Sequence, residues 1–165
     1  MSDWVETRLG DIADTASGGT PDRKNPNYYG GTIRWVKSGE LEDSFILETD
    51  EQLTTEGLKN SSAKIFPDGT LLMAMYGATV GKTAILKIPA ATNQAVCAIF
   101  PRNGSASTDF VRYALIHQRP EILAKNVRPF HERLAYDGKI AIPRHHAQRL
   151  RSLTRKNTCE FRMFG

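Results

Sequence analysis

The sequence has few cysteines and no long apolar run. Two cysteines occur among 165 residues, Cys97 in an apolar stretch and Cys159 near the end. So few cysteines suit a reducing compartment, where Cys97 would be a small core residue. No run of about eighteen apolar residues is present, and the acidic N-terminus lacks the apolar region of a secretory signal. We therefore expect a cytoplasmic protein without a membrane segment.

Signatures of catalysis and metal binding are also missing. The histidines are His117, His131, His145 and His146. They have neither a cysteine nor a second histidine at the spacing of a zinc site. Ser17 and Ser38 precede glycines but do not lie in the G-x-S-x-G motif of serine hydrolases. No motif for methyl transfer or for a methyl-donor cofactor is visible, so we expect no catalytic residues, no bound metal and no cofactor.

The positive charge of the chain is unevenly distributed. The net charge is +4 and the isoelectric point is near 9.2. Residues 1–118 carry 11 basic and 14 acidic side chains, whereas residues 119–165 carry 11 basic and 4 acidic ones. A nucleic-acid-binding protein is expected to present basic side chains to phosphates. The first three quarters of the chain would have to do so through local clusters, because their net charge is −3.

Glycine- and proline-rich turns divide the chain into short segments. Residues 17–31 are too rich in both residue types for a helix or a long strand, so we expect an ordered loop. Alternating or continuous apolar residues predict strands over 32–37, 70–75, 83–88 and 95–100. Helical spacing predicts one helix over 109–123, with Pro120 near its end. A weak helix or turn is expected near 54–57.

These elements favour an α+β fold. We expect a twisted, mainly antiparallel β-sheet with short strands, Gly/Pro-rich loops and a few helices. Before the loop, residues 6–16 form an entry segment in which Leu9, Ile12 and Ala13 are apolar anchors.

The segment GATVGKT (77–83) resembles a phosphate-binding P-loop but does not fit its pattern. That pattern places four residues between its glycines, whereas three separate Gly77 from Gly81. A P-loop lysine also opens a helix, whereas residues 85–88 suggest a strand. Two alternatives remain for this segment. It is either a plain hairpin turn, or a turn that presents Tyr76, Thr79 and Lys82 to a ligand such as a DNA phosphate.

Polar side chains that can read DNA bases lie near the ends of the predicted strands. Guanidinium and amide groups can form paired hydrogen bonds with base edges. The candidates are Arg23, Lys24, Asn25 and Asn27 in the loop, Arg34, Lys37 and Ser38 at one strand, and Asn93 and Gln94 before another. Each group alone is a weak signal, since such residues also cap turns and coat surfaces.

Several sequence blocks together resemble the target recognition domains of type I restriction-modification specificity subunits. The blocks are LGDI (9–12), SGGTP (17–21), YGGTIRWVKSGEL (29–41), TEGLKNSSAK (55–64), PDGTLLMAMYGATVGK (67–82) and ATNQAVC (91–97). Their order and spacing over about residues 4–125 are those of the family. The family carries the same Tyr-Gly-Ala-Thr-x-Gly-Lys turn without ATPase activity there, which argues further against a P-loop.

The resemblance implies a binding role in a bacterial restriction system. A specificity subunit of this family carries two such domains, and each reads half of a split target in double-stranded DNA. The subunit assembles with modification subunits, which methylate adenine using S-adenosylmethionine, and with an ATP-dependent restriction subunit. S-adenosylmethionine, ATP and Mg²⁺ are therefore expected only in the partner subunits.

The resemblance also assigns roles to individual residues. Phosphate contacts would come from turn amides, Lys37 and Lys82, and base contacts from loop side chains such as Arg23, Lys24, Asn93 and Gln94. Gly18, Gly19 and Trp35 would shape the scaffold. The full set of predicted DNA-binding residues is Arg23, Lys24, Arg34, Lys37, Ser38, Tyr76, Thr79, Lys82, Asn93 and Gln94.

The last forty residues depart from the family pattern. The expected glycine-rich stretch and spacer helix are replaced by segments rich in arginine and histidine, although Ile142-Pro143 is retained. We expect a recognition domain over residues 1–125 and a basic, poorly ordered tail over 126–165, as in a truncated or frameshifted gene product. Two alternative functions remain: a remnant that docks a modification subunit without reading DNA, and a small P-loop nucleotide hydrolase.

Overall fold

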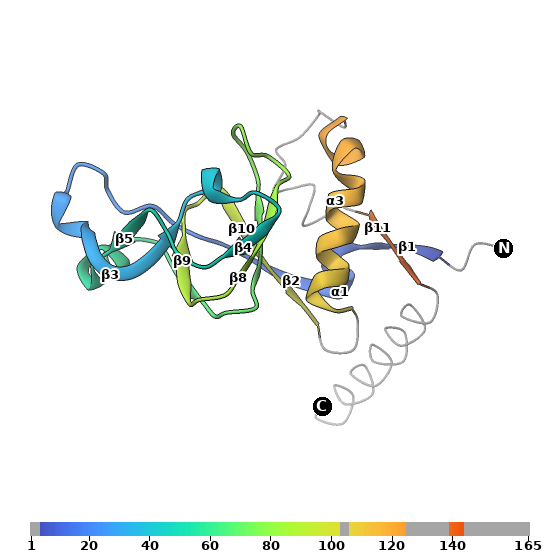
Figure 1. Ribbon diagram of the computed structural model, residues 1–165, viewed down its shortest axis with the longest axis horizontal. Coiled ribbons are helices and arrows are strands. Elements are labelled where there is room, and N and C mark those ends of the chain that lie inside the picture. Colours follow the sequence, from blue (N-terminus) through green and yellow to red (C-terminus); the bar gives the residue numbers. More distant parts are fainter. Residues whose placement is uncertain (1–3, 103–105, 125–138, 144–165) are drawn as a thin grey trace, which may run out of the picture.

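The computed structural model describes residues 4–102, 106–124 and 139–143 (Figure 1). In chain order the elements are β1 (Trp4–Arg8), α1 (Leu9–Ile12), β2 (Ala13–Ser17), η1 (Pro26–Tyr28), β3 (Tyr29–Val36), η2 (Ser38–Glu40), β4 (Ser44–Ile46), β5 (Glu51–Leu53), α2 (Thr55–Lys59), β6 (Ile65–Phe66), β7 (Leu71–Ala74), β8 (Thr83–Leu86), β9 (Ala90–Thr92), β10 (Val96–Pro101), α3 (Thr108–Ala124) and β11 (Lys139–Pro143). The strands form three sheets, with the orders β2-β10-β7-β8-β4, β5-β3-β9-β6 and β1-β11. The α+β class and the mainly antiparallel pairing are confirmed, although β4–β8 and β3–β9 pair in parallel.

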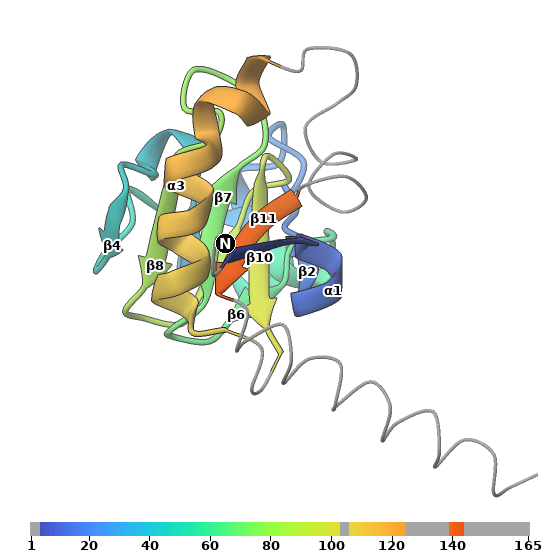
Figure 2. The same cartoon turned by 90° about the vertical axis from the view of Figure 1, so that its right-hand side faces the viewer.

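The central five-stranded sheet is covered by α3 on one of its faces. Leu71 and Met73 of β7 pack there against Val111 and Leu115 of the helix, and Leu9 of α1 belongs to the same cluster. Figure 2 shows α3 running across β7 and β8 on this side. The helix therefore closes one half of the core.

The opposite face of this sheet packs against the four-stranded sheet. Leu72 and Ala74, which alternate with the residues facing α3, share a buried cluster with Val36 of β3 and Phe66 of β6. Successive strand residues point to opposite faces, so a strand between two layers is apolar at every position. This explains the uninterrupted apolar run of β7, all of whose residues are buried.

The strands predicted from the sequence are confirmed, with small shifts of their ends. They correspond to β3, β7, β8 and β10, and the predicted helix to α3, which continues past Pro120. Leu9, Ile12 and Ala13 are all buried, as expected of anchors. The P-loop alternative is contradicted, because the turn at 77–82 leads into strand β8 and not into a helix. The sequence did not reveal β1, β2 and β11, nor β4, β5, β6 and β9, which are two or three residues long.

Part of the expected tail forms a strand. Lys139–Pro143 pairs antiparallel with β1, at the end of the long axis opposite β3 and β5 (Figure 1). This strand lies within the segment that was assigned to the tail. The domain boundary at residue 125 stays a prediction, and residues 126–138 and 144–165, including Cys159 and three of the four histidines, lie outside the described residues.

Two glycines let the predicted loop start close to β9. The Gly19 amide donates to the Thr92 carbonyl at 2.9 Å. A Cβ atom on Gly18 would collide with the side chain and carbonyl of Thr92, and one on Gly19 with the backbone of Ala63. The start of the loop therefore lies against the carboxyl end of β9, an inner strand of the four-stranded sheet, as expected of scaffold glycines.

Candidate functional site

The carboxyl ends of β3, β7 and β9 meet in one region. The Asn93 amide donates to the Val36 carbonyl at 2.9 Å, which holds the end of β9 beside that of β3. The Thr79 hydroxyl donates to the Ser38 carbonyl at 2.7 Å, which joins the glycine turn after β7 to η2. Segments far apart in the sequence thus place their polar residues side by side.

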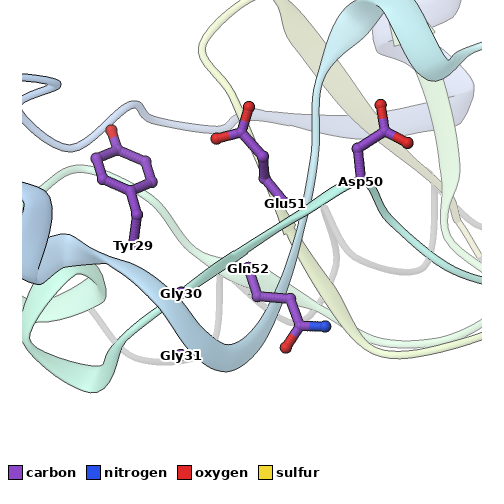
Figure 3. Close-up of a pocket in the computed structure, with 6 residues that line it drawn as sticks. All are labelled: Tyr29, Gly30, Gly31, Asp50, Glu51 and Gln52. Atoms are coloured by element: carbon purple, nitrogen blue, oxygen red, sulfur yellow. The ribbon is translucent and has the colours of Figure 1, made fainter.

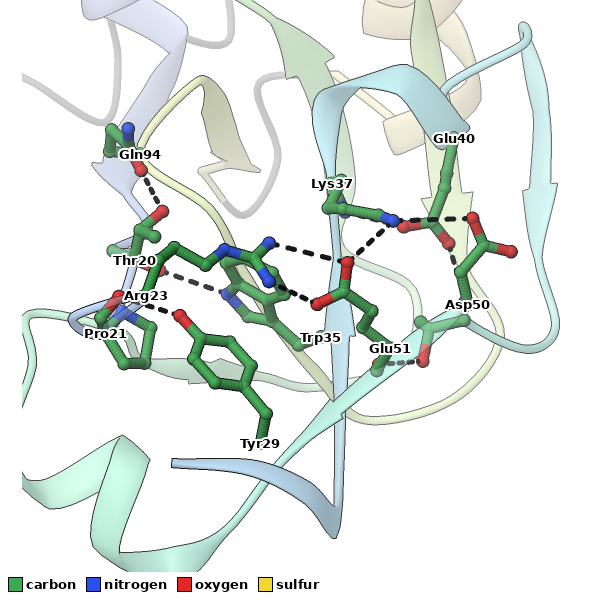
Figure 4. A network of polar contacts seen from close by, with 12 residues as sticks. Thr20, Pro21, Arg23, Tyr29, Trp35, Lys37, Glu40, Asp50, Glu51 and Gln94 are labelled. Carbon is green, nitrogen blue, oxygen red and sulfur yellow. Dashed lines mark hydrogen bonds and ion pairs between the residues drawn. The ribbon is translucent and has the colours of Figure 1, made fainter. Parts of the chain in front are cut away.

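Arg23 lies in a corner formed by two aromatic rings. Its guanidinium carbon is 4.6 Å from the ring centroid of Tyr29 and 4.7 Å from that of Trp35 (Figure 4). The rings themselves meet edge to face, with centroids 6.0 Å apart. The Tyr29 hydroxyl donates to the Pro21 carbonyl at 2.7 Å and the Trp35 indole N–H to the Gly19 carbonyl at 3.1 Å. Both rings are therefore fixed against the loop that carries Arg23.

Glu51 binds Arg23 and Lys37 at the same time. Its carboxylate accepts from Arg23 Nη1 at 2.5 Å and from Lys37 Nζ at 3.0 Å (Figure 4). The hydrogen bond from Arg23 lowers the pKa of Glu51 below its ordinary value, and that from Lys37 lowers it further. Glu51 in turn raises the pKa of both bases. At neutral pH all three groups are thus firmly charged.

Two further carboxylates surround Lys37. Asp50 lies 3.6 Å from its ammonium nitrogen. Glu40 accepts from the Lys37 amide at 2.8 Å and from the Asp50 amide at 3.2 Å, while burial raises its pKa. The cluster of Arg23, Lys37, Glu40, Asp50 and Glu51, below called the strand-end cluster, therefore holds two cations and three carboxylates. It is not a basic patch.

A shallow pocket borders this cluster where β3 bulges away from β5. The bulge falls between Tyr29 and Ile33, which both register with Leu53. The pocket has a volume of about 380 Å³ and is lined by Tyr29, Gly30, Gly31, Asp50, Glu51 and Gln52. Figure 3 shows Tyr29 and Glu51 on one side of the strands and Gln52 on the other. Aromatic and carboxylate groups thus line one side of the pocket, and an amide lies on the other.

The amide residues after β9 are engaged locally. The Thr20 hydroxyl donates to the Gln94 side-chain oxygen (Figure 4). The Asn93 side chain accepts from the Ala95 amide at 3.2 Å and so shapes its own turn. Gln94 is exposed and Asn93 half-buried, so the amide nitrogen of Gln94 is the better placed to contact a ligand.

The predicted DNA-binding residues do not form a single set. Arg23, Lys37, Ser38, Thr79, Asn93 and Gln94 come together at the strand ends. Arg34 lies exposed on the other face of β3, in register with Gln52. Lys24 is exposed in the loop, and Tyr76 is 46% exposed in the turn after β7, where Lys82 is half-buried.

The acidic members of the strand-end cluster were not foreseen. Glu51 reaches Arg23 across 28 residues and Lys37 across 14. Its position follows from the register of β5 against β3, which sets Glu51 opposite Trp35. Only a prediction of β5 with that register could have identified it.

A second ionic contact fixes α3 to the sheet, away from the strand-end cluster. The Asp43 carboxylate accepts from Arg119 at 2.5 and 2.9 Å and from the amide and hydroxyl of Thr83 at 2.9 and 3.1 Å. Arg119 Nε also donates to the Gly81 carbonyl at 2.8 Å. Arg119 of α3 thus holds the glycine turn in place through the Gly81 carbonyl.

The described part of the chain has neither a metal-binding cluster nor a membrane-spanning helix. No group of three or more histidine, cysteine or acidic side chains there could hold a metal ion. No helix among the described residues is long and apolar enough to cross a membrane. At the strand ends the described residues offer cationic, amide and aromatic groups together with the carboxylates that pair with the cations.

Part of this sequence is similar to the specificity subunits of two type I restriction enzymes. The specificity subunit of the type I restriction enzyme MjaIX from Methanocaldococcus jannaschii is 36% identical over 108 residues, which cover 64% of this chain and 25% of that protein. The EcoR124I/EcoR124II specificity subunit from Escherichia coli is 25% identical over 121 residues, 64% of this chain and 30% of that one. The chain therefore spans about a quarter to a third of the length of these relatives.

Solved structures share the fold. The crystal structure of the HsdS subunit from Thermoanaerobacter tengcongensis matches 96% of this chain and 38% of its own, with a TM-score of 0.64 and 19% identity. The S subunit of the type I restriction-modification system from M. genitalium matches 94% and 40%, with a TM-score of 0.59 and 15% identity. The family model of the type I restriction modification DNA specificity domain matches residues 1–154. The chain belongs to the type I restriction modification DNA specificity domain family.

Proposed function

We propose that this chain reads one half of a bipartite DNA target for a type I restriction-modification complex. The observation that carries the proposal is the convergence of cationic and amide side chains at the carboxyl ends of β3, β7 and β9. Such groups serve both parts of DNA recognition, since phosphate contacts position a protein and base contacts specify the sequence. Family membership and the names of the relatives support the same role.

The exposure of the candidate residues indicates which of them suit base contacts and which suit phosphate contacts. Gln94 is exposed at the strand ends, where its amide group can reach base edges. Lys24 and Arg34 are also exposed, but Lys24 lies in the loop and Arg34 on the other face of β3. Lys82 and the backbone amides of the glycine turn suit phosphate contacts. Arg23 and Lys37 are held by Glu51 and can contact DNA only when that pairing is exchanged for another.

Catalysis is assigned to other subunits. We propose that modification subunits supply S-adenosylmethionine-dependent methylation and that a restriction subunit supplies ATP- and Mg²⁺-dependent cleavage. The present chain would direct both by binding DNA. The alternative of a remnant that docks a modification subunit without reading DNA makes the opposite prediction for DNA binding.

Selection from a random duplex library tests the proposal. The full 165-residue chain, alone and with its modification subunits, is incubated with the library at low salt, and retained duplexes are sequenced. Enrichment of a short sequence supports DNA reading, and Gln94→Ala is expected to change the bases enriched at one position. Retention by the assembled complex without any enrichment would favour the docking remnant.

A further inference from the structure

In the arrangement around Glu51, an acidic side chain holds two cations that a DNA-binding protein could present to phosphates. Arg23 and Lys37 are the two cations of the strand-end cluster, and one carboxylate binds both, at 2.5 and 3.0 Å. The same guanidinium and ammonium donors that bind a carboxylate also bind a phosphate. A carboxylate between two such cations thus occupies the position that a phosphate oxygen would take.

The pairing is accessible to an incoming ligand. The side chains of Arg23, Lys37 and Glu51 are 50%, 31% and 32% exposed, so the contact lies open to solvent. Exposed ion pairs contribute little to stability and exchange partners at low cost.

Arg23 does not rely on Glu51 alone for its position. Its guanidinium lies against Tyr29 and Trp35, and both rings are anchored by hydrogen bonds to the loop backbone. A cation–π contact of this kind keeps the guanidinium plane in place when its ionic partner changes. The cation therefore stays available to a different anion.

We propose that Glu51 acts as an internal competitor for DNA phosphate, holding Arg23 and Lys37 until a phosphate group displaces it. The inference rests on the proposed function. Displacement leaves Glu51 without its two partners. The free energy needed to break these two contacts reduces the affinity that Arg23 and Lys37 would otherwise give to a bound duplex. Since phosphates carry no sequence information, Glu51 sets the strength and salt dependence of binding, and not the choice of sequence.

The consequence is measurable in Glu51→Gln. With the competitor removed, duplex affinity at 50 mM salt is expected to rise about tenfold. The slope of log affinity against log salt concentration is expected to steepen by about one, because no displaced carboxylate with its own counterion then lies beside the bound phosphate. A duplex selected by the chain and a scrambled duplex gain equally. Glu48→Gln is the matched control: Glu48 is exposed three residues away and forms no ion pair within the described residues.

The experiment is fluorescence anisotropy of labelled duplexes with the full chain over a range of salt concentrations. Wild type, Glu51→Gln, Glu48→Gln and the triple variant Arg23→Gln/Lys37→Gln/Glu51→Gln are compared, after thermal melting has shown that each is folded. The inference is supported if only Glu51→Gln gains affinity and if the triple variant loses that gain. It is overturned if Glu48→Gln gains as much, if the triple variant keeps the gain, or if only the selected duplex gains. Should none of the proteins bind any duplex, the proposed function itself fails.

Discussion

Arg119 of α3 and Asp43, 76 positions earlier in the chain, form a two-pronged ion pair, with N–O distances of 2.5 and 2.9 Å. Asp43 adopts a φ of +58°, in the left-handed region, so its position before β4 carries backbone strain. The carboxylate also accepts from Thr83 at the start of β8. This contact links a helix, a strand and a loop that the sequence separates widely.

Loss of the Arg119 side chain is expected to destabilise the fold. Arg119→Met leaves the Asp43 carboxylate with only its Thr83 donors, in a site where both side chains are less than a third exposed. Removing one partner of such a pair costs about 1–3 kcal/mol in the free energy of unfolding. Urea denaturation measures it, with Lys64→Met as the control for removal of an exposed cation. Equal midpoints for the two variants would show that the contact is not structural.

The ion pair of Asp43 and Arg119 predicts that the stability of the fold depends on pH. Burial raises the pKa of Asp43, but the hydrogen bonds from Arg119 and Thr83 outweigh burial and leave the pKa below 3.8. A lowered folded-state pKa gives stability that is present above the unfolded value and is lost as the pH falls through the folded value. The stability difference between wild type and Asp43→Asn should therefore be constant above about pH 5 and shrink below it. A difference that stays constant down to pH 2 would contradict the assignment.

The loop entry is expected to tolerate no side chain at Gly19. An added Cβ would collide with the backbone of Ala63, whereas at Gly39 it would meet nothing within 4 Å. Gly19→Ala should lower the free energy of unfolding by about 2 kcal/mol or more, a typical cost of forced repacking. Gly39→Ala should change it by less than about 0.5 kcal/mol. Thermal melts of the two variants side by side measure the contrast, and similar melting temperatures would refute the close approach.

Cys97 is expected to be chemically inert in the folded chain. Burial raises the pKa of its thiol to about 12, so at pH 8 only about one molecule in ten thousand carries the reactive thiolate. In a Cys159→Ser background, Ellman's reagent should label Cys97 only as fast as the protein unfolds, and completely in urea. Full labelling within minutes in native buffer would show that the reagent reaches Cys97 in the folded chain, which would contradict its burial in β10.

Continuous apolar strands could be predicted because burial on both faces marks them. β7 and β10 lie between two layers, and their side chains face α3 and the second sheet in alternation. Such runs are recognisable from sequence alone. Strands of two or three residues, like β5 and β6, carry no periodicity, because one alternation is too short to stand out from a loop.

The two cations of the strand-end cluster could be predicted, and its three carboxylates could not. Arg23 and Lys37 were identified because cations near Gly-rich loops and strand ends suit DNA contacts. Glu51 was not, because its place depends on the pairing of β5 with β3. The sequence shows a small net negative charge over residues 1–118, but it does not show which cations are paired. Only the fold shows that Glu51 pairs with both Arg23 and Lys37.

The most direct test is whether the chain binds one DNA sequence more tightly than another. The dissociation constants of the selected duplex and of a scrambled duplex of equal length and composition are determined by anisotropy at 150 mM salt, with the modification subunits present. Specific recognition predicts binding of the selected duplex that is tighter by about a thousandfold or more. Equal dissociation constants for the two duplexes would contradict the account, whatever the affinity.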